Sequence, residues 1–204
     1  MRTTRVYANP TVWATALLLL IGASLTLTRV QARQDVSMDK AYINRVLDAM
    51  HDAASKADGQ AYFSYFDEGA VFLGTQSDER WAIPEFKEYV LPRFAEGKGW
   101  TYIPTTRHIY LNDEGTAGWF DEFLSNEKYG NCRGTGAVVK KNFEWKIVQY
   151  NLTVPIPNDL LPQFVESIRA HEKKVVEQQL EHRRKVIEEL QKENNPNPPT
   201  KPQG

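Results

Sequence analysis

The chain has 204 residues, with 25 basic and 26 acidic side chains and a formal net charge of −1. Removal of residues 1–32, which is expected below, takes away three arginines and no acid, so 22 bases would face 26 acids. This mildly acidic balance gives no general reason to expect a nucleic-acid partner. The single cysteine, Cys132, excludes an internal disulfide and is expected to be a small buried residue.

The first 32 residues differ in kind from all that follow. Two arginines precede an uncharged run over residues 12–28, and Val30 and Ala32 occupy the two positions that a signal peptidase reads. We predict a secretory signal peptide over residues 1–32, and hence a secreted or periplasmic protein with no membrane contact after cleavage. The alternative is an uncleaved anchor, but the run is shorter than the roughly 20 apolar residues that a spanning helix needs.

Three helices and one strand are predicted next. Apolar residues recur at three- and four-residue spacings over residues 38–54, which indicates a helix that ends before Asp58-Gly59. A short ring-rich helix is predicted over residues 59–66, and its rings are expected to belong to the core. A strand over residues 70–74 follows. Pro84 then opens a third helix, at a position where a missing amide proton costs nothing.

Four antiparallel strands are predicted after these helices, over residues 100–111, 115–124, 132–140 and 144–152. Helices that are segregated from a run of strands indicate an α+β domain, in which the helices cover one face of a curved sheet. The space between them is a cone, and its mouth is where a ligand would enter.

Three stretches carry a resemblance to a known family: FLGTQSDERW after the first strand, AGWFDEFL in the meander and WKIVQYNLTVPIPN at its close. With the order of elements over residues 38–158, they resemble the SnoaL-like domains of the nuclear transport factor 2-like superfamily. The resemblance implies a cone-shaped, cystatin-like α+β fold, a pocket between helices and sheet, and a homodimer through the outer sheet face. It leaves the activity open, since the superfamily contains isomerases, cyclases, dehydratases and non-enzymatic modules.

Asp121 is the candidate catalytic residue. It alternates with Trp119 and Phe123 along its strand, and the resemblance implies that this face lines the cone. A carboxylate walled by rings could serve as a general acid or base. The alternative is a structural ion pair or hydrogen bond, with Arg107, Arg133 or a backbone amide as the partner.

Other side chains are expected to orient a ligand. Gln149 and Asn151 stand where many relatives carry two histidines, and amides can orient a ligand but cannot exchange protons near neutral pH. His108 is adjacent to Arg107, so only one of the two can face the pocket. The predicted ligand-binding set is Trp81, Trp100, Tyr102, His108, Trp119, Asp121, Gln149 and Asn151, although rings in strands are more often core.

Two classes of function fit these residues. The first is an exported module that binds a small organic molecule in an apolar pocket oriented by a few polar side chains. The alternative is a cofactor-independent isomerase, cyclase or dehydratase that uses Asp121 as its general acid or base. The four histidines and Cys132 lack metal-ligand spacing, and no phosphate-cradling loop or serine elbow is present, so neither a metal nor a cofactor is expected.

A long charged helix is predicted over residues 159–193. Apolar residues keep one side of it, while acids and bases are balanced on the rest. The apolar stripe is expected to pack on its own domain or, as a coiled coil, on a second copy. The tail over residues 194–204 is rich in proline and asparagine and is predicted to be disordered.

Overall fold

The computed structural model describes residues 34–194. The predicted signal peptide and residues 195–204 of the predicted tail lie outside the described residues. The chain forms two compact units that divide after Pro155, and each is considered by itself. Within the described part, no helix is both long enough and apolar enough to cross a membrane.

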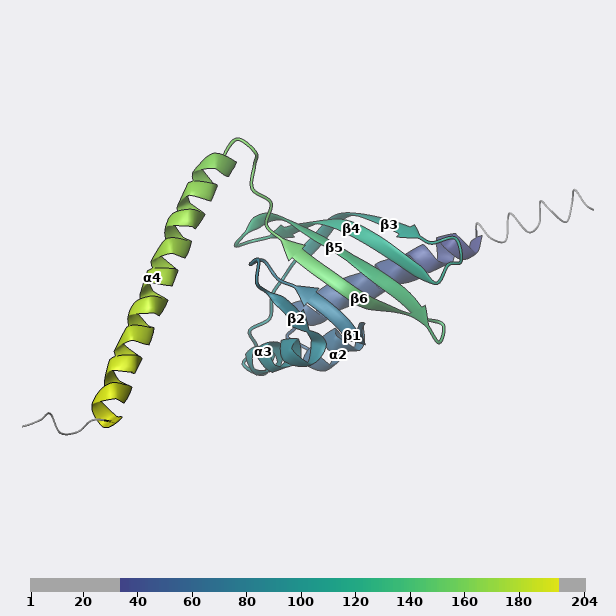
Figure 1. Ribbon diagram of the computed structural model, residues 1–204. Coiled ribbons are helices and arrows are strands. Elements are labelled where there is room, and N and C mark those ends of the chain that lie inside the picture. Colours follow the sequence, from purple (N-terminus) through teal and green to yellow (C-terminus); the bar gives the residue numbers. More distant parts are fainter. Residues whose placement is uncertain (1–33, 195–204) are drawn as a thin grey trace, which may run out of the picture. The chain divides into compact units, whose positions relative to one another are not determined.

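The first unit is built on a curved six-stranded sheet that does not close into a barrel (Figure 1). Its strands lie in the order β2-β1-β6-β5-β4-β3. They are β1 (Phe66–Leu73), β2 (Arg80–Ala82), β3 (Ile103–Leu111), β4 (Ala117–Asn126), β5 (Gly130–Lys141) and β6 (Glu144–Thr153). Strands β3 to β6 form the predicted antiparallel meander. The sequence did not predict β2, nor that β1 pairs in parallel with β6.

Helices cover one face of this sheet, here called the inner face (Figure 1). They are the helix over residues 34–55, α2 (Gly59–Ser64) and α3 (Ile83–Ala95). Asp58 caps α2 by accepting a hydrogen bond from the amide of Ala61 at 2.9 Å. At the start of α3, Glu85 accepts one from the amide of Ala82 at 3.2 Å. The α+β fold predicted from the sequence is confirmed.

The core lies between the helices and the inner face. Tyr62 is 1% exposed and makes edge contacts with Phe94 and Trp100, whose ring centroids lie 5.7 Å away in each case. Burying a large apolar side chain stabilises the fold by about 1.5–3 kcal/mol. Phe66 is also buried. The sequence predicted that it ends the helix over residues 59–66, but in the structure it begins β1.

The face assignment predicted for β4 is wrong. The inner face of this strand carries Phe120, Glu122 and Leu124, which are 0–3% exposed. Trp119 and Phe123 point to the opposite, outer face and are 54% and 46% exposed. Both faces of β4 are apolar in composition, so alternation alone could not decide which one is covered.

The face assignment predicted for the end of β6 is also wrong, for a different reason. This strand contains one extra residue, Val148, relative to β5. A bulge shifts the alternation of side chains by one position. Ile147 and Tyr150 are therefore both buried on the inner face, while Gln149 and Asn151 lie on the outer face.

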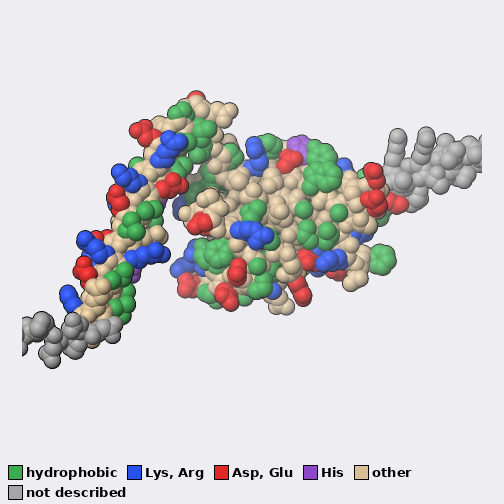
Figure 2. All heavy atoms as spheres, in the orientation of Figure 1, with side chains coloured by type: hydrophobic (Ala, Val, Ile, Leu, Met, Phe, Trp, Pro, Cys, Tyr) green, Lys and Arg blue, Asp and Glu red, His purple; other side chains and the backbone are tan. Residues whose placement is uncertain are grey.

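The second unit contains α4 (Leu161–Asn194), a helix of 34 residues. It begins two residues after the predicted start at Asp159, which lies in a turn. Figure 2 shows acidic and basic side chains along the whole of α4, interleaved with hydrophobic ones. An α-helix of this length extends for about 50 Å.

Candidate functional site

Seven aromatic rings surround a hollow in the first unit. Its volume is about 220 Å³. The lining side chains come from β1, the loop before β2, β2 itself, α3, the segment before β3, the turn between β4 and β5, and β6. The lining residues are Phe72, Gly74, Thr75, Glu79, Trp81, Phe86, Tyr89, Arg93, Trp100, Tyr102, Tyr129 and Leu152.

The rings at the hollow are held in fixed contacts. Trp81 stacks on Tyr89 with their centroids 5.5 Å apart, and the Arg93 guanidinium lies 5.5 Å from the same tyrosine ring. Burial raises the pKa of Tyr102 to about 12, with smaller contributions from Cys132 and Tyr129. A tyrosine hydroxyl is protonated near neutral pH even at its ordinary pKa of 10.0, and burial extends this to higher pH, so the Tyr102 hydroxyl can donate a hydrogen bond.

Three residues of the predicted ligand-binding set meet in this hollow: Trp81, Trp100 and Tyr102. The structure separates them from the other five, which lie on the outer face of the sheet. Those five are His108, Trp119, Asp121, Gln149 and Asn151. The predicted single pocket is thus divided between two places on opposite faces of the sheet.

Asp121, the predicted catalytic residue, does not face the cone. Its Oδ2 lies 2.9 Å from Nδ1 of His108, which is its Cα partner in the ladder between β4 and β3. The two side chains are 40% and 50% exposed respectively. An acid or base in a pocket needs contact with an enclosed ligand, and this position on the outer face does not supply it.

The carboxylate that does face inward is Glu122, whose side chain is 0% exposed. The Tyr150 hydroxyl donates to its Oε1 at 2.7 Å, and Nε2 of His51 lies 2.8 Å from the same oxygen. Arg107 Nε donates to Oε2 at 2.8 Å. These four residues, here called the Glu122 cluster, were not predicted as a group.

Arg107 also ties the cluster to the helix over residues 34–55. Its Nη1 donates to Oδ1 of Asn44 at 3.0 Å and to Oδ1 of Asp48 at 2.8 Å. Its Nη2 lies 2.7 Å from Oε2 of Glu122 but outside hydrogen-bond geometry, so this buried nitrogen forms an ion pair without a hydrogen bond. Both oxygens of Glu122 are therefore occupied by protein groups.

The electrostatics of the cluster favour an ionised Glu122. Burial alone would raise the pKa of this carboxyl. The hydrogen bond and charge of His51, the charge of Arg107 and the hydrogen bond from Tyr150 outweigh burial and hold the pKa below its ordinary value. The Glu122 cluster is thus a buried, paired carboxylate that joins the first helix to β3, β4 and β6.

One sequence signal does point to Glu122. Gly134 is its Cα partner in β5, and a Cβ at position 134 would lie 2.7 Å from Oε1 of Glu122. Gly136 stands in the same way opposite Phe120. Glycines at alternate positions of β5 therefore make room for the large inward side chains of β4, and they indicate which face of β4 is inner.

One aromatic ring contacts both the hollow and the Glu122 cluster. Phe72 lines the hollow and stacks on Tyr150, with centroids 5.7 Å apart and an interplanar angle of 12°. Glu122 itself does not line the hollow. Among residues 34–194, no three side chains of His, Cys, Asp or Glu gather as metal ligands would.

The family model described as the SnoaL-like domain matches residues 43–157, which is more than half of the chain. The chain belongs to the SnoaL-like domain family. The matched segment contains all six strands, the hollow and the Glu122 cluster, and it ends before α4. The predicted family is therefore confirmed.

Solved structures support the same fold for this SnoaL-like domain. A domain of unknown function with a cystatin-like fold from Nostoc punctiforme has a TM-score of 0.51 at 13% identity, covering 72% of this chain and 98% of its own. A nuclear transport factor 2-like protein of unknown function from Pseudomonas putida has a TM-score of 0.51 at 8% identity, and the match covers 60% of this chain and 90% of that protein. A candidate dehydratase of the nuclear transport factor 2-like family from Streptomyces avermitilis has a TM-score of 0.50 at 11% identity, and the match covers 59% of this chain and 99% of that protein. No curated protein sequence matches the chain significantly.

Proposed function

We propose that this SnoaL-like domain binds a small, flat, partly apolar organic molecule in the ring-lined hollow. The observation that carries the proposal is the convergence of Trp81, Trp100 and Tyr102 with four other rings around one open space. The volume of about 220 Å³ lies below the roughly 300–1,000 Å³ of sites for drug-sized ligands. A molecule of one or two rings is therefore the expected size.

The polar groups at the hollow favour a ligand that carries oxygen acceptors. The Tyr102 hydroxyl is protonated near neutral pH and can donate, and Arg93 supplies a positive charge beside Tyr89. The acid at the hollow, Glu79, is already engaged, because its carboxylate accepts a hydrogen bond from the amide of Gln76 at 3.1 Å. Aromatic ketones and aromatic carboxylates match this combination of rings, donors and one cation.

The test is a thermal-shift and calorimetric screen of one- and two-ring aromatic ketones and acids. A ligand at 100 times its Kd should stabilise the fold by about 2.7 kcal/mol. For any ligand found, Trp100→Ala should weaken binding by about tenfold or more. The stacking of a flat ring, such as a nucleobase, on an aromatic side chain contributes about 1–3 kcal/mol. The matched control, Trp119→Ala, removes the same ring from the outer face.

Equal affinities in the wild type and Trp100→Ala would contradict the proposal. The recovered ligand also decides between the two functional classes. An unchanged ligand supports a binding module, whereas a converted one indicates an enzyme. An enzyme that used Asp121 would lose turnover in Asp121→Asn, although the position of this residue on the outer face does not favour that mechanism.

We further propose a homodimer through the outer sheet face. Trp119 and Tyr110 stack there with centroids 5.8 Å apart and are 54% and 46% exposed. Figure 2 shows hydrophobic side chains gathered over β3 and β4 beside a histidine. Exposed rings of this kind are characteristic of interfaces. Trp119→Asp should lower the dimer fraction in sedimentation equilibrium, and an unchanged mass would contradict this interface.

Export is the third part of the proposal. It is supported by the uncharged run over residues 12–28 behind two arginines. Mass spectrometry of the protein recovered from the periplasm or medium should give a chain that begins at Arg33. Retention of residues 1–32 would indicate an anchor instead.

A further inference from the structure

The sequence of α4 repeats every eleven residues. The segments are FVESIRAHEKK over residues 164–174, VVEQQLEHRRK over 175–185 and VIEELQKEN over 186–194. Each begins with two apolar residues followed by glutamate. Eleven residues in three turns give 3.67 residues per turn, close to the 3.6 of a straight helix, so equivalent positions stay on one side of α4.

The repeat produces one continuous apolar surface, here called the α4 stripe. In the structure its larger side chains are exposed: 43% for Phe164, 53% for Val176 and 52% for Leu190. Covering such an apolar surface removes it from water and lowers the free energy of the protein. The stripe comprises Phe164, Val165, Ile168, Val175, Val176, Leu180, Val186, Ile187 and Leu190.

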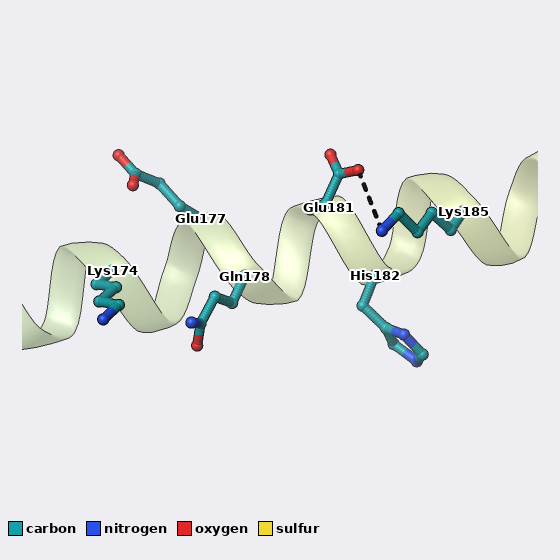
Figure 3. Close-up of a pocket in the computed structure, with 6 residues that line it drawn as sticks. All are labelled: Lys174, Glu177, Gln178, Glu181, His182 and Lys185. Carbon is teal, nitrogen blue, oxygen red and sulfur yellow. Dashed lines mark ion pairs between the residues drawn. The ribbon is translucent and has the colours of Figure 1, made fainter.

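The opposite face of α4 is polar. Figure 3 shows six side chains of α4: Lys174, Glu177, Gln178, Glu181, His182 and Lys185. They line a shallow concavity that is formed by this helix alone. Glu181 pairs there with Lys185 at 3.7 Å and with Arg184 at 2.7 Å. The helix therefore has one face suited to water and one suited to a partner.

Two charges near the middle of the stripe favour one orientation of that partner. Glu172 and Arg183 are eleven residues apart, and helical periodicity places both near the middle of the stripe. Two parallel helices in register would set Glu172 against Glu172 and Arg183 against Arg183. Two antiparallel helices centred between Glu177 and Gln178 would instead set Glu172 against Arg183 twice.

The same antiparallel register pairs six of the nine stripe residues with one another. It sets Val165 against Leu190, Ile168 against Ile187 and Val175 against Leu180, while the other three stripe residues face the longer polar side chains of Gln and Arg. We propose that α4 of one copy packs antiparallel on α4 of a second copy in this register. The interface follows from the charges and spacing of α4 and does not depend on what the hollow binds.

A charge-exchange cycle tests the register in the full chain. The chain carries Trp119→Asp throughout, so that an association through the sheet does not obscure one through α4. Glu172→Arg and Arg183→Glu should each weaken dimerisation by about tenfold or more in sedimentation equilibrium, since each brings like charges together. The double variant should restore it. The matched control is Glu177→Arg on the polar face, which should leave it unchanged (Figure 3).

Two results would overturn the proposal. In the first, both single variants dimerise like the parent, as a parallel pair would. In the second, the parent remains a monomer while Ile187→Asp lowers its melting temperature, as expected if the stripe packs on its own domain. A cysteine experiment is independent of charge. When Val176→Cys and Gln179→Cys chains are mixed and oxidised, mixed disulfides should exceed those between identical chains, while buried Cys132 stays unreactive.

Discussion

Asp121 and Glu122 are neighbours in β4, each lies within 3 Å of a histidine nitrogen, and yet they occupy opposite environments. Glu122 faces the helices at 0% exposure and has partners on both oxygens. Asp121 faces outward, and its side chain is 40% exposed. One step along the strand thus changes a hydrated carboxylate into a desolvated one.

This difference decides what each contact contributes. An exposed ion pair contributes about 0–1 kcal/mol, because water and salt screen the charges. A buried charge costs several kcal/mol to desolvate, so its partners become essential once it is inside. The two carboxylate–histidine pairs have nearly equal lengths, 2.8 Å for Glu122 and 2.9 Å for Asp121, but they therefore differ in energy.

The largest effect is expected for Glu122→Ala. It leaves Arg107, which is 6% exposed, without its carboxylate partner in the core. We expect a loss of about 3–5 kcal/mol of unfolding free energy in urea denaturation. Asp121→Ala is the matched control. Similar losses of unfolding free energy in the two variants would contradict a buried, essential role for Glu122 alone.

Protonation of Glu122 should weaken the same contacts without removing the side chain, and its effect should be smaller. Because the folded state holds the pKa of Glu122 below its ordinary value, the unfolded chain takes up this proton more readily. The stabilisation is fully present above the ordinary pKa of about 4.5 and is lost as pH falls through the folded pKa. The stability difference between wild type and Glu122→Gln should therefore shrink in acid, and a difference independent of pH would refute this.

Tyr150→Phe should cost about 1 kcal/mol, because Oε1 of Glu122 loses one buried donor. Burial, followed by the charge of Glu122, raises the pKa of Tyr150 well above its usual range, so the hydroxyl is a donor at any ordinary pH. Tyr110→Phe removes a hydroxyl from the outer face and should change chemical denaturation midpoints little. Equal shifts for both would indicate that the Tyr150 hydrogen bond has no net effect.

The smallest effect is expected for Asp121→Asn. The amide keeps an oxygen near His108 but removes the charge from an exposed pair. We expect a change within about 0.5 kcal/mol in urea denaturation at low salt, and less at high salt. A loss above about 2 kcal/mol would show that Asp121 has a buried role that the pair with His108 does not explain.

The fold could be predicted from the sequence because the order of helices and strands was decided by local patterns. Pro84 lies in the first turn of α3, and the gap between the strands predicted over residues 132–140 and 144–152 contains Asn142 and Phe143, which form the turn between β5 and β6. Asn142 and Phe143 both have positive φ, of 49° and 66°, as a tight hairpin requires. These signals act over a few residues and need no tertiary context.

The site could be predicted only in part. The structure does bring Trp81, Trp100 and Tyr102 together at the ring-lined hollow. Asp121 was misplaced because both faces of β4 are apolar, so its covered face depends on the register with β5. Gln149 was misplaced because no local pattern marks the bulge, which depends on pairing with β5.

Val148 also determines which polar side chains this sheet encloses. Ahead of it β6 presents Ile147 to the interior, and beyond it Tyr150, which belongs to the Glu122 cluster. Without the bulge at Val148, strict alternation from Ile147 would turn Gln149 and Asn151 inward and would turn outward the tyrosine that Glu122 requires. The bulge thus places one ring and a single hydroxyl on the inner face instead of a pair of amides.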